Sequence, residues 1–120
     1  MNPDALLFFQ PRPDALALYA ALEAALLARF PDTRIAVQKT QISFCGSRLF
    51  ACVSLPRRKR DTGLLLTFGL GRRADSPRIA CVSEPYPGRF THHLPLRSEA
   101  ELDDAVWEFV REAYDFSEQK

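Results

Sequence analysis

The sequence has no long apolar run, and its hydrophobic stretches fall well short of the ~20 residues that a membrane-spanning helix needs. The N-terminal stretch MNPDALLFFQPRPD contains a short apolar patch. It lacks the basic flank and the small-residue cleavage site of a secretory signal. We therefore expect neither a membrane span nor secretion.

Cysteine is also scarce, and its pattern excludes a disulfide framework. The three cysteines, Cys45, Cys52 and Cys81, are odd in number and none belongs to a C-x-x-C motif. This favours three reduced, half-buried thiols in strands. Together with the missing signal it predicts a cytoplasmic protein. No ligand spacing links the cysteines to a histidine, so we expect no metal and no cofactor.

Charge of one sign is not in excess, since the formal net charge is +1, but the two signs are separated along the chain. Residues 48–97 hold ten basic and three acidic side chains, whereas residues 98–120 hold two basic and eight acidic ones.

The length of the chain, 120 residues, is that of one domain, 1–120. A hydrophobic content of 47% excludes a disordered chain.

The hydrophobic pattern predicts a helix, a series of strands and a second helix. After an N-terminal extension (1–12), the sequence indicates a helix over 13–30, with a stripe of Leu18, Tyr19, Leu22, Leu26 and Phe30. Five or six strands follow in 34–96, including RIACV and RFTHHLPL. Pro95 suggests that the last strand is an edge strand, and EPYPG reads as a loop.

The second helix is expected over 98–115. Its stripe is Leu102, Val106, Phe109, Val110 and Ala113, and Ser98 with Glu101 forms a capping box. The connections between strands are too short for parallel crossovers, so the sheet should be mostly antiparallel. Two helices on one face of it would give an α+β fold, a two-layer sandwich.

The strands LFACVSL and LLLTFGL are apolar at nearly every position, which is typical of strands covered on both faces. Two helices cannot easily cover both sides of such a sheet. The second face then needs the LLFF segment, a ligand or another subunit, and we expect a homodimer.

The stretch GRFTHHLPL holds the only two histidines of the chain, His92 and His93. Neighbouring side chains of a strand point to opposite faces. His92 then shares the apolar face with Phe90 and Leu94, and His93 points to the other. Two diverging rings cannot easily bind one metal, so His93 is the histidine more available for function.

Basic residues are the main candidates for a binding site. Four of them follow one another in the connector PRRKRDTG, and two more end the stretch GLGRR. Such clusters can hold phosphates and other anions. The candidate anion-binding residues are Lys39, Arg57, Arg58, Lys59, Arg60, Arg72, Arg73, Arg89 and His93.

Besides a purely structural role, in which the acidic C-terminal helix of one subunit faces the basic middle of another, three readings of function stay open. The first is a binding or interaction domain for a protein partner or a small anionic ligand. The second is a nucleic-acid-associated accessory protein, which is less favoured because the basic connector has no interleaved aromatic residues. The third is a small enzyme in which a cysteine works with His92 or His93. No catalytic constellation is recognised, so an enzyme is the less favoured class.

A resemblance to a known family rests on the segments KTQISF, LFACVSLPRRKR, LTFGLGRR, PRIACVSEPYPGRFTHHLPL and WEFVREAY. From about Leu7 to Ser117 the chain resembles a bacterial family catalogued as domain of unknown function 5655. The resemblance implies a small cytoplasmic α+β domain to which no activity is assigned.

Overall fold

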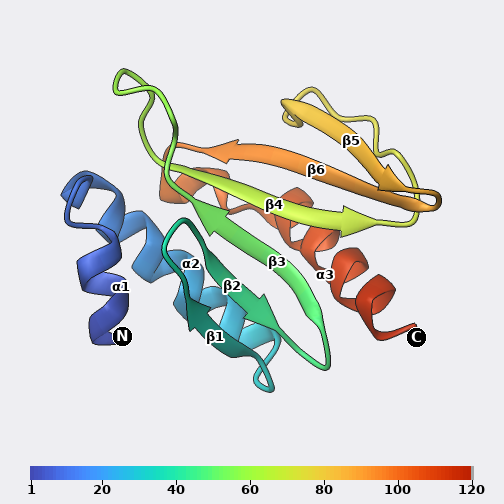
Figure 1. The fold of residues 1–120 in the computed structure, drawn as a ribbon, viewed down its shortest axis with the longest axis horizontal. Helices are drawn as coiled ribbons and strands as arrows, with labels where there is room; N and C mark the ends of the chain where they lie inside the picture. The colour runs from blue at the N-terminus through green and yellow to red at the C-terminus, as the bar shows by residue number, and fades with distance from the viewer. Residues whose placement is uncertain (120) are drawn as a thin grey trace.

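The computed structural model describes residues 1–119 and contains three α-helices, two short 3₁₀ turns and six strands (Figure 1). The helices are α1 (Pro3–Phe8), α2 (Leu16–Arg29) and α3 (Asp104–Glu118), and the 3₁₀ turns are Pro13–Ala15 and Glu99–Glu101. The strands are β1 (Arg34–Val37), β2 (Ile42–Cys45), β3 (Leu49–Ser54), β4 (Leu64–Leu70), β5 (Cys81–Tyr86) and β6 (Arg89–Leu96).

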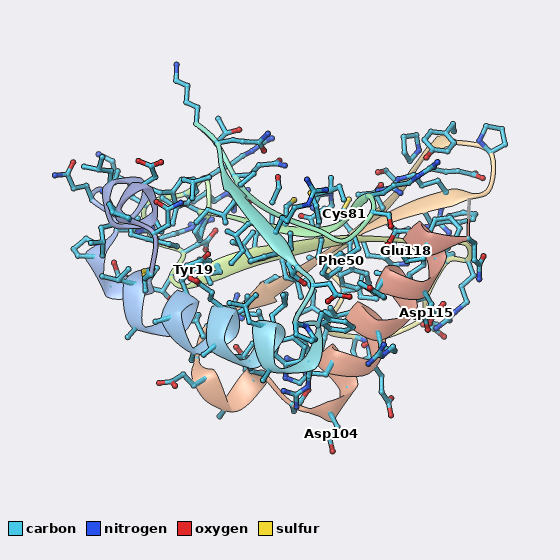
Figure 2. The ribbon with its side chains drawn as sticks, turned by 90° about the horizontal axis from the view of Figure 1, so that it is seen from below. Tyr19, Phe50, Cys81, Asp104, Asp115 and Glu118 are labelled. Atoms are coloured by element: carbon cyan, nitrogen blue, oxygen red, sulfur yellow. The ribbon has the colours of Figure 1, made fainter. Side chains whose placement is uncertain are left out.

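The six strands form one antiparallel sheet in the order β1-β2-β3-β4-β6-β5. The edge-on view of Figure 2 shows the blue helix α2 and the red helix α3 below the sheet. Neither covers the opposite side, which we call the uncovered face. The predicted fold, a two-layer α+β sandwich, is confirmed.

The core lies between the sheet and the two helices, and the predicted stripe of α2 supplies one side of it. All five residues of that stripe are buried. The sheet contributes the inward positions of its strands, which are Ile42, Phe44, Val53, Leu64, Leu66, Phe68, Leu70, Leu94 and Leu96. Inward positions alternate with positions on the uncovered face, so the core fixes which side chains that face presents.

A β-bulge adds one aromatic ring to this core. The pairing of β2 with β3 shifts its register between Phe44 and Cys45, which leaves Phe50 as the extra residue. The ring of Phe50 is buried, with centroid distances of 5.6 Å to Phe30 and 5.1 Å to Tyr114. The bulge therefore joins the ends of α2 and α3 to the middle of the sheet.

The last helix differs from the predicted range 98–115, because it runs over Asp104–Glu118. The side chain of Ser98 makes no capping hydrogen bond. The N-cap is Asp103 instead, whose carboxylate accepts from the backbone of the first turn and from the guanidinium of Arg78 at 2.8 Å. Arg78 comes from the connection between β4 and β5, so this cap depends on a contact distant in sequence.

The predictions for the last two strands need correction. The strand predicted at 78–82 lies at Cys81–Tyr86, so most of EPYPG is strand. β6 is not an edge strand, because it lies between β4 and β5. The backbone of His93 faces β5, since its carbonyl accepts from Ala80 at 2.8 Å. The nitrogen of Pro95, two residues on, faces the same side beyond the last paired residue of β5, where no N–H is needed.

The extension 1–12 contains α1, which the sequence pattern did not predict. Its apolar patch does not cover the second face of the sheet, as we had considered. Phe9 is buried against Tyr19 of α2, with ring centroids 5.0 Å apart. In this position α1 lies beside β1, at the edge of the sheet (Figure 1).

Candidate functional site on the uncovered face

The two adjacent histidines point to opposite faces, as the strand pattern predicts. His92 is fully buried and stacks on Phe68 with ring centroids 5.3 Å apart. Its Nδ1 donates to the carbonyl of Phe90 at 2.9 Å, and its Nε2 accepts from the backbone N–H of Ala74 at 2.9 Å. Burial lowers the pKa of His92 below its usual value. His92 is therefore a neutral residue of the core.

His93 belongs to a row of side chains that crosses the uncovered face. The paired positions are Ser43 with Cys52, Cys52 with Thr67, Thr67 with His93, and His93 with Cys81. Paired positions of antiparallel strands share a face, so these five side chains form one line, which we call the cross-strand row. Thr67 Oγ1 and His93 Nδ1 form a hydrogen bond of 3.0 Å.

A basic side chain from a neighbouring loop acts on this row. The pKa of His93 is lowered, first by burial and second by the positive charge of Arg57. Arg57 lies in the loop between β3 and β4, which holds the connector 57–60. Lys39 lies in the β1–β2 loop at the same end of the sheet. The structure therefore gathers most of the predicted basic candidates at one end of the uncovered face.

Arg89 lies at the other end of the same face, at the start of β6. Its side chain crosses Gly69 of β4 so closely that a Cβ at Gly69 would be 2.7 Å from the guanidinium carbon. A glycine at this position leaves the space that the guanidinium occupies. Arg89 is thus held close against the sheet; its predicted binding role stays a prediction.

Arg72 and Arg73 are not brought to the uncovered face with the other candidates. Arg72 binds the carboxylate of Glu112 on α3 through two hydrogen bonds of 2.8 Å. Arg73 lies over the ring of Phe90, whose side chain is on the helix side, at 5.7 Å from its centroid. Arg72 therefore stabilises a contact with α3, and Arg73 contacts β6 on the helix side of the sheet.

The acidic last segment and the basic middle segment meet within one chain. Besides Arg72 with Glu112, Arg78 pairs with Asp103 at 2.8 Å. Glu118 accepts hydrogen bonds from the backbone N–H and the hydroxyl of Ser47 at 2.9 and 2.8 Å. These contacts lower the pKa of all three carboxyls. Part of the separated charge is thus neutralised internally, on the helix side.

The structure places one thiol opposite a histidine of the cross-strand row. Cys81 is exposed and stands opposite His93, but no hydrogen bond joins a thiol to an imidazole within residues 1–119. Burial raises the pKa of the Cys52 thiol, which lowers its thiolate fraction.

Cys81 is expected to react with 5,5′-dithiobis(2-nitrobenzoate) at pH 8 about tenfold faster than Cys52. Cys81 is exposed, whereas Cys52 is half-buried and has a raised pKa. Stopped-flow absorbance measures the rates. The substitution Cys81→Ser should remove the fast phase, and Cys52→Ser should leave it; a fast phase that survives in Cys81→Ser contradicts the assignment.

One hollow was not anticipated from the sequence. It lies where the turn after β2, the β5–β6 hairpin and the end of α3 meet, and we call it the hairpin pocket. Its volume is about 390 Å³, and Arg48, Leu49, Tyr86, Arg89 and Phe116 contribute to its lining. These residues are far apart in sequence and share no motif, so only the fold brings them together.

The fold and these surfaces define a small two-layer α+β domain whose sheet is open on one side. Within residues 1–119 no group of three potential ligands could hold a metal ion, and no helix has the length and apolarity to span a bilayer.

The chain belongs to the family described as domain of unknown function (DUF5655), whose model matches residues 7–117. The comparisons with curated proteins and with solved structures give no match.

Proposed function

We propose that this protein is a binding domain that holds an extended anionic ligand on its uncovered face. The observation that carries this proposal is the distribution of charge on that face. Basic side chains lie at both ends of it, and the strand positions between them hold no acidic residue. A cytoplasmic location belongs to the same proposal and is supported by three free cysteines, Cys45, Cys52 and Cys81.

The composition of the face follows from the strand register. The positions that alternate with the core are Arg34, Ala36, Ser43, Cys45, Leu49, Cys52, Ser54, Leu65, Thr67, Gly69, Cys81, Ser83, Tyr86, Arg89, Thr91, His93 and Pro95. Two arginines, one histidine and several hydroxyl groups are donors for anions, and no carboxylate competes with the ligand. The nearly continuous apolar sequence of β4 does not make its outer side apolar throughout, because the outward positions are Leu65, Thr67 and Gly69.

The spacing of the basic groups favours a ligand that extends over the sheet. His93, beside Arg57, is four residues from Arg89 along β6, which corresponds to about 13 Å. One phosphate group cannot contact both ends. A chain of anionic groups, or a ligand with two of them, can bridge the cross-strand row and reach Arg89.

The other sequence-based candidates become outcomes of the same experiment. A nucleic acid is one extended anion, but the connector 57–60 offers no aromatic ring for stacking on bases. A homodimer through the uncovered face also stays a prediction. Light scattering at micromolar concentration tests it, and a monomer would contradict it.

The protein is expected to be retained on heparin at about 50 mM salt, and its affinity should fall about tenfold or more by about 200 mM salt. The double variant Arg57→Gln/Arg60→Gln should elute at lower salt than the parent. The charge-matched control is Arg72→Gln/Arg111→Gln, which removes two arginines on the helix side of the sheet, since Arg72 binds Glu112 and Arg111 lies over the ring of Phe30. It should elute with the parent.

Two results would overturn the proposal. One is the absence of retention at low salt. The other is an equal loss in both double variants, because the binding would then depend on net charge and not on the uncovered face. A labelled single-stranded oligonucleotide in the same series separates nucleic-acid binding from general binding of anionic polymers.

A further inference from the structure

The hairpin pocket combines two features that rarely meet on a protein surface by chance. Outside α1 and Met1, the exposed large hydrophobic residues of the described chain are Leu49 and Tyr86, at 40% and 53% exposure. Both line this pocket, although they are 37 positions apart in the sequence. Phe116 and Pro87 add to the apolar lining. An apolar surface of this kind, gathered in one hollow, is typical of a ligand site.

The same pocket also holds two cations without carboxylate partners. Arg48 and Arg89 both line it, and neither forms a salt bridge within residues 1–119. Two carboxylates lie near the pocket and each is already hydrogen-bonded. Glu118 accepts from Ser47, which with Arg48 lowers its pKa, and Glu84 accepts from the backbone N–H of Gly88 at 3.2 Å. The guanidinium of Arg89 is held over Gly69 and is therefore already ordered before a ligand arrives.

We infer that the hairpin pocket binds a small organic anion with an apolar body, such as an aryl-substituted carboxylate or sulfonate. The volume of about 390 Å³ lies within the usual range for small-ligand sites, roughly 300–1,000 Å³. The arginines take the anionic group through charge-assisted hydrogen bonds, and the rings of Tyr86 and Phe116 contact the apolar body.

This inference is separate from the binding of an extended anion on the uncovered face. Arg89 borders both surfaces, but Arg57 and Arg60 lie at the opposite end of the sheet, and Leu49 and Tyr86 belong to the hairpin pocket. The Arg57→Gln/Arg60→Gln variant leaves every residue of the pocket lining unchanged, and Leu49→Ser removes no charge from the uncovered face. The failure of one proposal can therefore be distinguished from the failure of the other.

The test uses the fluorescent aromatic sulfonate 1-anilinonaphthalene-8-sulfonate and its displacement by 3-phenylpropionate. We expect saturable binding of the dye and displacement by the acid with a Kd below about 1 mM. The neutral analogue 3-phenylpropanol and the small anion acetate should displace it at least about tenfold less well, because each supplies only one half of the interaction. Chemical shifts of the Leu49, Gly88 and Gln119 amides should change on addition of the acid.

The variants Arg48→Gln and Leu49→Ser should each weaken binding of 3-phenylpropionate about tenfold or more. Both side chains are exposed, so the fold should tolerate the changes. The matched controls are Arg97→Gln, and Leu7→Ser in α1, where Leu7 is also exposed. Equal displacement by the acid and the alcohol, no displacement at millimolar acid, or equal weakening by the controls overturns the inference.

Discussion

Replacement of Gly63 by alanine is expected to lower the free energy of unfolding by about 3 kcal/mol or more. Gly63 precedes β4 and has a φ of +83°, a conformation that costs an L-residue about 1–2 kcal/mol. A Cβ would also lie 2.0 Å from the carbonyl oxygen of Leu96 and 2.9 Å from Cα of Arg97. These are backbone atoms of the paired strand end, so they cannot move without opening the β4–β6 ladder.

The chain offers a matched control for this substitution. Gly88, in the β5–β6 hairpin, has nearly the same φ of +84°, but a Cβ there would meet no atom within 4 Å. Gly88→Ala should therefore cost only the conformational part, about 1–2 kcal/mol. Urea unfolding of both variants measures the difference. Equal losses would show that the contact with Leu96 contributes nothing.

Replacement of His92 by alanine should cost about 3 kcal/mol or more at pH 7.5. The change removes a fully buried ring that packs on Phe68, and it leaves the backbone N–H of Ala74 without its acceptor. The variant His92→Gln offers a side-chain oxygen that can replace Nε2 as this acceptor. It should therefore lose less stability than His92→Ala.

His92 also makes stability depend on pH. Its pKa is lowered in the folded state, so the unfolded chain binds the proton more readily. The contribution is fully present above the unfolded pKa of about 6.5 and is lost as the pH falls through 6.5 towards the folded pKa. For one group the slope is at most about 1.4 kcal/mol per pH unit.

Urea unfolding between pH 7.5 and 5.5 tests this dependence. The carboxyls with lowered pKa values act mainly below about pH 4.5 and should not interfere. His93 acts in the same direction, since its pKa is also lowered, so the comparison is between the protein and His92→Gln. An unchanged slope in that variant would assign the effect to His93 or to other groups.

Local patterns in the sequence predicted much of the fold because they depend on near neighbours. The spacing of Leu18, Leu22 and Leu26 defines the buried side of α2, and the alternation in β6 separates His92 from His93. The predicted start of α3 at residue 98 was wrong. The helix is capped by Asp103, and this cap is completed by Arg78, 25 residues away in the sequence. The prediction that β6 is an edge strand was wrong because the effect of Pro95 depends on where β5 ends, and the sequence pattern does not show that.

In the candidate site, too, the features that depend on near neighbours were predicted and those that depend on distant contacts were not. His93 and the connector 57–60 could be found from the sequence, since one depends on strand period and the other on composition. The ion pair of Arg72 with Glu112 could not be predicted from the sequence, because the two residues meet only when α3 packs on the sheet. The joining of Leu49 with Tyr86 depends on the bulge in β3 and on the position of the β5–β6 hairpin, which no local pattern records.

The cross-strand row has a practical consequence for spectroscopy. By strand register all three cysteines lie on the uncovered face, and Cys81, in the edge strand β5, is exposed (Figure 2). A ¹⁹F or fluorescent tag attached to Cys81 would stand directly opposite His93, at the β5 edge of the surface where we expect the ligand. The native chain can thus report the arrival of a ligand through its own side chain, with no cysteine introduced.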